Sequence, residues 1–132
     1  MTGRLTIVEV GPRDGLQNEP DPIATAEKVA LIDALSATGL ARIEAAAFVS
    51  PRAVPQMADG TDVMARIARP PGVRFSALVP NLRGLQTAIA AGVDEVAVFA
   101  AASETFSQRN INATITESLA RFEPVAEGAR EA

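Results

Sequence analysis

Short apolar runs alternate with longer amphipathic stretches along this chain. Four runs have the length and the nearly continuous apolar character of strands buried on both faces: residues 5–10, 40–47, 73–79 and 93–100. Between and after them, helical periodicity predicts helices over 26–37, 62–68 and 82–91 and a last helix after Thr114. Four strand–helix units in a row predict an α/β fold with a parallel sheet and right-handed crossovers.

Capping and breaking residues set the expected ends of these helices. Thr25 is expected to cap the first helix and Asn81 the third, and Thr114 with Glu117 has the form of a capping box. Pro124 is expected to kink or shorten the last helix, because proline removes a backbone donor and crowds the preceding turn. The stretches 48–59 and 103–112 are expected to be an irregular connection and a polar loop.

Composition narrows the class of protein. The 132 residues suffice for one domain, and a hydrophobic fraction of 48% supports a packed core. Net charge is −4, from 12 basic and 16 acidic residues without a basic cluster, so a nucleic-acid partner is not expected. No run approaches the roughly 20 apolar residues of a membrane span. A strand begins almost at once, which leaves no room for a targeting peptide, so we expect a cytoplasmic protein away from the membrane.

The chain contains neither His nor Cys. Histidine is the commonest general base and transition-metal ligand, and cysteine supplies thiolate ligands, nucleophiles and disulfides. Any metal held here is therefore expected to have oxygen ligands, which points to Mg²⁺, Mn²⁺ or Ca²⁺.

Polar side chains follow the predicted strands, where parallel α/β folds place their functional groups. The first strand stops at Gly11-Pro12 and is followed by Arg13 and Asp14, while Glu44 lies within the second strand. Polar residues also gather near the ends of strands one, three and four: Gln17, Asn18, Asn81, Ser103, Glu104, Asn110 and Asn112.

Each of these residues also has a structural interpretation. Arg13 and Asp14 could form a surface ion pair of little consequence, or half of an active site. Glu44 lies in an apolar run and needs a cation, for which Arg13 is the natural partner; a structural pair and a catalytic pair both satisfy this requirement. Asn81 is more simply a helix cap, and Asn110 a hydrogen-bonding residue of its loop.

The segment 8–19, VEVGPRDGLQNE, resembles the N-terminal signature of hydroxymethylglutaryl-CoA lyases. The resemblance continues in register over nearly the whole chain, through 31–35, 43–44, 48–52, 54–57, 80–84, 101–104 and 110–112. These lyases belong to a superfamily named for an Asp, an Arg and a Glu on a TIM barrel, and those residues match Asp14, Arg13 and Glu44.

The resemblance implies a role for each matched residue. Asp14 would bind a divalent cation, Mg²⁺ or Mn²⁺, and no organic cofactor is implied. Arg13 would neutralise charge on the substrate carbonyl and on the enolate formed by cleavage, and Glu44 would orient the site and support Arg13. Gln17, Asn110 and Arg13 itself are expected to contact the acyl-CoA substrate.

The implied reaction is the retro-Claisen cleavage of 3-hydroxy-3-methylglutaryl-CoA to acetyl-CoA and acetoacetate, as in leucine breakdown. The enzyme is expected to be a homo-oligomer, namely a dimer. The family's other metal ligands, two His and an Asn, and a reactive Cys lie on later strands. A complete barrel needs eight strands and about 250 residues. Residues 1–132 are therefore expected to form the N-terminal half of a (β/α)₈ barrel, with no second domain and little activity alone.

Two alternatives remain open. One is a related acyl-CoA lyase or Claisen-type synthase of the same superfamily. The other is a non-catalytic truncated barrel that self-associates, because open edges of apolar strands invite pairing.

Overall fold

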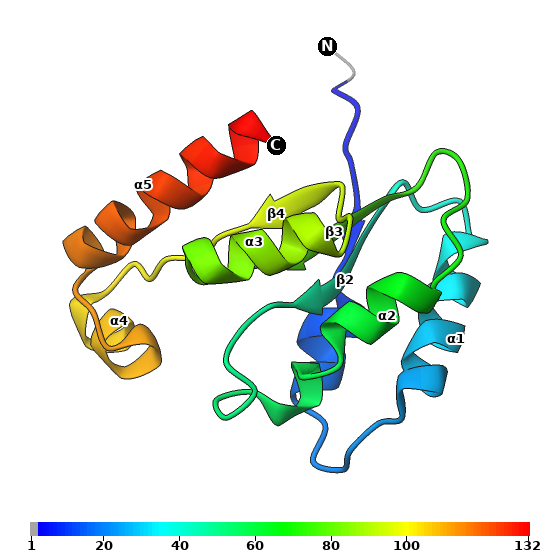
Figure 1. The fold of residues 1–132 in the computed structure, drawn as a ribbon, viewed down its shortest axis with the longest axis horizontal. Coiled ribbons are helices and arrows are strands. Elements are labelled where there is room, and N and C mark those ends of the chain that lie inside the picture. The colour runs from blue at the N-terminus through cyan, green and yellow to red at the C-terminus, as the bar shows by residue number, and fades with distance from the viewer. Residues whose placement is uncertain (1–2) are drawn as a thin grey trace.

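The computed structural model describes residues 3–132, in which four parallel strands form one sheet in the order β1-β2-β3-β4 (Figure 1). The strands are β1 (Val8–Glu9), β2 (Arg42–Ala47), β3 (Arg74–Leu78) and β4 (Glu95–Ala97). Val8 lies opposite Arg42, and Ser76 opposite Glu95, so every strand pairs with its neighbour in sequence. The predicted parallel α/β fold is confirmed.

Helices follow each strand. They are α1 (Thr25–Ser36), α2 (Gly60–Arg66), α3 (Leu82–Ala90), α4 (Glu104–Ile111) and α5 (Ile115–Glu131), with a π-helical turn η1 (Gly11–Gly15) and a 3₁₀ turn η2 (Pro55–Met57). Helices α1, α2 and α3 cover one face of the sheet, and α5 packs on α3 (Figure 1). Consecutive strand order with helices on one face is the arrangement of a barrel wall, whereas a doubly wound sheet carries helices on both faces.

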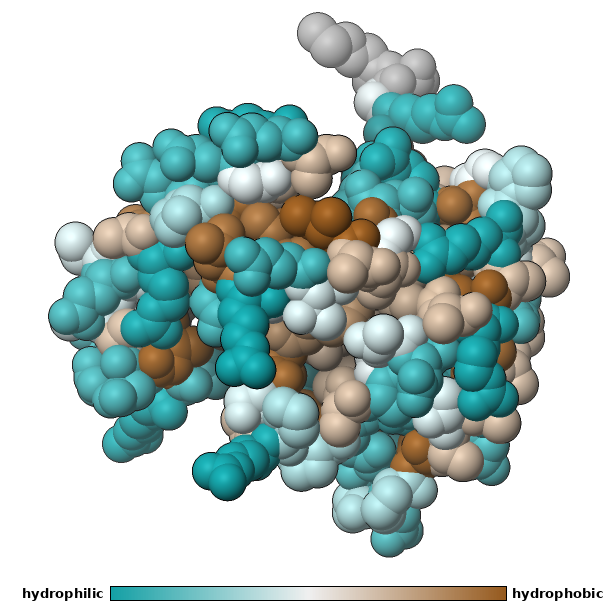
Figure 2. Space-filling view, in the orientation of Figure 1, coloured by the Kyte–Doolittle hydropathy of each residue, from teal (hydrophilic) through white to brown (hydrophobic). Residues whose placement is uncertain are grey.

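Two apolar clusters hold the helices to the sheet. The larger joins α1 and α2 to β2 and β3 through Ile32, Ile43, Ala45, Ala46, Val63, Met64, Ile67, Phe75 and Ala77. The smaller joins α3 and α5 through Val79, Leu85, Ala88 and Val125. Apolar side chains are also visible on the surface between α3 and α5 (Figure 2). Burial of this apolar area is the main force that keeps the layers together.

The first strand is shorter and more exposed than the pattern predicts. Only Val8–Glu9 pairs as a strand, and the side chains of Leu5 and Ile7 are 92% and 70% exposed. The expectation that residues 5–10 are buried on both faces is wrong for this structure. The physical reason is that Leu5 and Ile7 lie before the two-residue strand β1 and belong to neither of the apolar clusters that pack the helices on the sheet.

Two other local expectations are also wrong. Ala24, not Thr25, is the N-cap residue of α1, and the Thr25 hydroxyl donates to Asp59 Oδ2 at 2.7 Å instead. Residues 104–111 form helix α4, not a polar loop. The Ser103 hydroxyl caps this helix by accepting from the Phe106 amide at 3.2 Å, and the helix ends at Asn112, whose φ of 51° is left-handed.

The remaining caps follow the sequence. Asn81 Oδ1 accepts from the Gly84 amide at 2.9 Å, and Thr114 forms a capping box with Glu117. Helix α5 continues past Pro124 to Glu131, so the proline does not shorten it. Pro124 lies on the exposed side of the helix, where water can satisfy the carbonyl that loses its donor. Within the part of the chain that the structure describes, none of the helices combines the length and apolar character that crossing a bilayer requires.

Candidate active site

The turn after β1 delivers Arg13 and Asp14 beyond the end of the strand. Gly11–Gly15 forms a π-helical turn in which the amides of Arg13 and Asp14 both donate to Val10 O, at 3.1 and 2.7 Å. The Gly11 amide donates to Glu9 Oε1 at 2.7 Å, and a Cβ at position 11 would lie only 2.8 Å from that oxygen. A side chain at position 11 would therefore displace the Glu9 carboxylate from this hydrogen bond, and proline suits the first turn because it needs no amide donor.

Arg13 lies between two carboxylates. Its Nε donates to Glu44 Oε1, and its Nη1 lies 3.2 Å from Asp14 Oδ1. The side chains of Arg13 and Glu44 are 16% and 8% exposed, whereas that of Asp14 is 57% exposed. The prediction that Arg13 is the cation for the buried Glu44 is confirmed.

This arrangement supplies a fixed positive charge beside an accessible carboxylate. Burial makes an unpaired Glu44 costly, so the pair holds the guanidinium in one orientation. A preorganised cation of this kind can stabilise an oxygen that becomes negative during a reaction, without the reorganisation that water would need. The geometry alone fits either a catalytic group or a structural ion pair.

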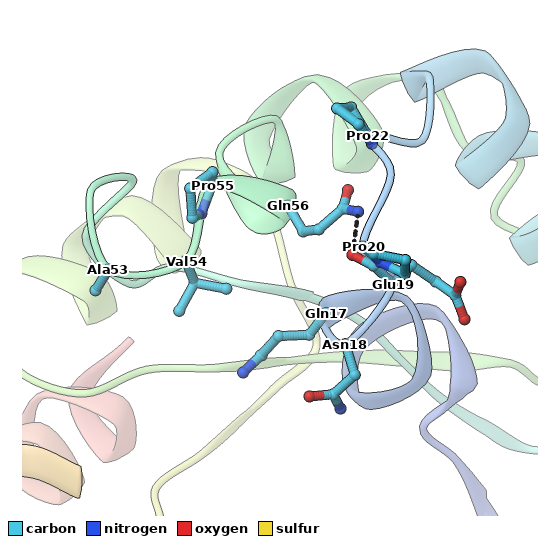
Figure 3. A pocket seen from close by; sticks show the side chains of 9 residues that line it. All are labelled: Gln17, Asn18, Glu19, Pro20, Pro22, Ala53, Val54, Pro55 and Gln56. Carbon is cyan, nitrogen blue, oxygen red and sulfur yellow. Dashed lines mark hydrogen bonds between the residues drawn. The ribbon is translucent and has the colours of Figure 1, made fainter. Parts of the chain in front are cut away.

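Gln17 borders a cavity of about 360 Å³ near this turn. The cavity lies between the segment that follows η1 and the segment around η2 (Figure 3). Its walls are Gln17, Asn18, Glu19, Pro20, Pro22, Ala53, Val54, Pro55 and Gln56. A half-buried amide at the wall of a cavity is suitable for hydrogen bonding to a ligand, and its role in substrate binding stays a prediction.

Asn110 is not brought to this site in the structure. It is exposed on α4, which follows β4, and β4 and β1 are opposite edges of the sheet. It lines neither the cavity beside Gln17 nor a second one of about 350 Å³ beside Asn81. Its expected contact with substrate therefore stays a prediction.

A buried lysine on α1 was not identified from the sequence. Lys28 is 5% exposed, and its Nζ donates to Asp59 Oδ1 at 2.7 Å and to the Gln56 carbonyl. Burial alone would raise the Asp59 pKa, but hydrogen bonds from Lys28 and Thr25 and the Lys28 charge lower the pKa below its ordinary 3.8. The sequence does contain a feature that predicts its burial: Lys28 lies four residues before Ile32, on the apolar side of the helix.

The described residues do not complete a metal site. Within 3–132, no group of three or more acidic side chains converges where an ion could bind. Asp14 offers one carboxylate, and Arg13 lies beside it, whereas Mg²⁺ prefers six oxygen ligands. The residues of this chain therefore do not by themselves fit a divalent cation.

Comparison with known proteins shows which family the chain resembles. The family model described as HMGL-like matches residues 4–132. A curated lyase of Pseudomonas aeruginosa, named for 3-hydroxy-3-isohexenylglutaryl-CoA and hydroxy-methylglutaryl-CoA, is 59% identical over 128 residues, which are 97% of this chain and 43% of the relative. The mitochondrial hydroxymethylglutaryl-CoA lyase of Gallus gallus is 57% identical over 98% of this chain and 43% of its own length.

The fold matches as well. The crystal structure of hydroxymethylglutaryl-CoA lyase from Pseudomonas aeruginosa superimposes with a TM-score of 0.93 at 59% identity, over 97% of this chain and 43% of that chain. The chain thus spans less than half the length of these relatives, and its four strands are part of a TIM barrel. The family match over nearly all of its residues shows that the chain belongs to the HMGL-like family.

Proposed function

We propose that this chain carries the enolate-stabilising part of a hydroxymethylglutaryl-CoA lyase. The observation that supports the proposal is Arg13, held by the buried Glu44 and beside the exposed Asp14 at the carboxyl edge of a parallel sheet. The relatives are named as lyases of this substrate class. Their chemistry develops negative charge on oxygen, which is what a fixed guanidinium can stabilise.

The proposed reaction is a retro-Claisen cleavage. The 3-hydroxyl of 3-hydroxy-3-methylglutaryl-CoA loses its proton and becomes the ketone of acetoacetate as the C2–C3 bond breaks. The bonding electrons pass to the thioester carbonyl, and the resulting enolate takes up a proton to give acetyl-CoA. Arg13 stabilises the enolate oxygen, and Glu44 keeps the guanidinium in place. A base must accept the hydroxyl proton, and with no His or Cys in the chain a residue of these types cannot be that base here.

The other site residues have supporting roles in the proposal. Gln17 and Asn110 contact the acyl-CoA. Asp14 would supply one carboxylate ligand to a divalent cation, Mg²⁺ or Mn²⁺, which needs further oxygen ligands. Residues 1–132 form half of an eight-stranded barrel, so the isolated chain has little or no activity.

The test uses the chain alone and a chimera in which it replaces the matching region of the Pseudomonas aeruginosa lyase. Acetoacetate release from 3-hydroxy-3-methylglutaryl-CoA with Mn²⁺ is expected from the chimera and not from the chain. In the chimera, Arg13→Met is expected to lower kcat by about 10²–10³, the usual effect of removing one oxyanion donor. The matched control is Arg121→Met, which changes an exposed arginine of α5. Full activity in the Arg13 variant would rule out this role.

The exact acyl group, location and assembly are also proposals. One relative is named for a substrate with a longer acyl group, so a panel of 3-hydroxyglutaryl-CoA esters separates the lyase from related acyl-CoA enzymes. Relatives named as mitochondrial and as cytoplasmic both match, and we propose a cytoplasmic homodimer active in leucine degradation. Fractionation of cells tests the location, and sedimentation of the chimera tests the oligomeric state.

The exposed edge of the sheet favours a second candidate, a non-catalytic role by self-association. Leu5 and Ile7 lie beside the edge strand β1, and such edges pair readily with other chains. Sedimentation of residues 1–132 is then expected to show association that Ile7→Lys weakens. A monomer at the highest attainable concentration contradicts this candidate.

A further inference from the structure

Lys28 occupies an unusual position for a lysine. Its side chain is 6% exposed and lies on the face of α1 that also buries Ile32. Lysine is almost never this buried without a partner, because removing its charge from water is costly. The contacts of its ammonium group therefore show what it does.

The ammonium group joins α1 to the connection that follows β2. Nζ donates to Asp59 Oδ1 at 2.7 Å and also to the Gln56 carbonyl. The second oxygen of Asp59 accepts from the Thr25 hydroxyl at 2.7 Å, so both oxygens bond to α1. The backbone at Gln56 is thus held by a partly buried, charge-assisted hydrogen bond.

The side chain of Gln56 extends this network to the connection that follows β1. Its Nε2 donates to the carbonyls of Glu19 and Asp21 at 2.9 and 2.6 Å, and its Oε1 accepts from the Ile23 amide at 3.3 Å. Figure 3 shows this amide reaching across to Glu19. One glutamine therefore satisfies three backbone groups of the neighbouring connection.

These two connections are the walls of the cavity beside Gln17, and one of them begins at the turn that carries Arg13. Asn18, which also lines the cavity, donates through Nδ2 to Asp14 O at 2.8 Å. The contacts that start at Lys28 thus reach Glu19, and its neighbour in sequence, Asn18, bonds to the backbone of the candidate site.

We propose that Lys28 is a positioning residue, which acts through Gln56 to hold the connections after β1 and β2 at the spacing that shapes the cavity beside Gln17. A purely structural lysine would only add to the global stability of α1. A positioning lysine controls the order of one segment, 16–24. The proposal deepens the proposed function, because it concerns the same site, but its test does not need activity.

The test is hydrogen exchange of the 132-residue chain, followed by mass spectrometry or NMR. Lys28→Met keeps the apolar stem and removes the charge. The Ile23 amide and its neighbours in 16–24 are expected to exchange about tenfold faster or more, while amides of the central sheet, such as Val79, keep their protection. The matched control is Arg69→Met, which removes another cation that donates to backbone carbonyls, those of Met64, Ala91 and Gly92. It is expected to leave 16–24 unchanged.

A second pair of variants tests the route through Gln56. Gln56→Leu is expected to accelerate amide exchange in the same segment. The double variant with Lys28→Met is expected to exchange no faster than either single variant, because both changes break the same chain of contacts. If Lys28→Met does not fold, Asp59→Asn weakens the same contact and gives a smaller acceleration in the same place.

Three results would overturn the inference: unchanged exchange at Ile23, equal acceleration at every amide, or additive effects of the two variants. Each is measured without substrate. Failure of the lyase assay with selective loss of protection in 16–24 would instead reject the proposed function and keep the positioning role.

Discussion

The ion pair between Arg13 and Glu44 offers the sharpest prediction about stability. Arg13→Met leaves Glu44, whose side chain is 8% exposed, without its cation. Removing one partner of a fully buried pair costs about 3–5 kcal/mol, and the partial exposure of this pair places the expected loss near the lower end, at roughly 3 kcal/mol. Glu44→Gln leaves Arg13 charged but 16% exposed and beside Asp14, so we expect a smaller loss of about 1.5 kcal/mol.

Equilibrium unfolding in urea, followed by far-ultraviolet circular dichroism, measures these losses, since the chain has no Trp or Tyr for intrinsic fluorescence. The double variant is expected to cost clearly less than the sum of the two single variants, because each change removes the same contact. Asp14→Asn is the control, and its 57% exposed carboxylate should contribute less than about 1 kcal/mol. Additive single effects, or a larger loss from Asp14→Asn than from Arg13→Met, would refute this account of the pair.

Three further predictions concern other parts of the fold. Gly84→Ala places a Cβ 2.7 Å from Phe48 O, so we expect a loss of about 1–3 kcal/mol in the free energy of unfolding, and a neutral result would contradict this packing. The lowered pKa of Asp59 stabilises the fold above about pH 3.8, and this stability is lost as the pH falls through the folded-state pKa. Asp59→Asn should therefore flatten the acid side of the stability–pH curve, whereas the exposed Asp62→Asn should not. Thr114→Ala removes the capping box of α5 and should cost about 1 kcal/mol in urea unfolding; an unchanged midpoint would show that the cap adds nothing.

Much of the fold follows from local patterns in the sequence. Apolar runs and caps such as Asn81 are properties of neighbouring residues, so they predict four strand–helix units and their order. The exposure of Ile7 depends instead on what lies beyond the edge of the sheet, which no local pattern contains. The hydrophobic pattern does not predict helix α4, because its residues are mostly polar; its ends are set by Ser103 and Asn112.

Some contacts of the site can likewise be predicted from the sequence, and others cannot. Arg13 and Glu44 could be paired from the sequence because consecutive parallel strands bring their ends together, and a buried carboxylate requires a cation. The bonds of Gln56 to Glu19 and Asp21 could not be predicted, because they depend on how two irregular connections fold back on each other. Lys28 could have been identified as a charge on an apolar helix face, but its partners could not.

The consecutive strand order has a consequence for the way the chain folds. Each strand pairs with the strand that precedes it in sequence. The connection closed by each pairing therefore contains a single strand–helix crossover, which limits the entropy lost in closing it. Arg13 and Glu44 are separated by 31 positions and belong to the first two strand–helix units. Their ion pair can therefore form while later units are still being synthesised, and each new strand extends a growing edge.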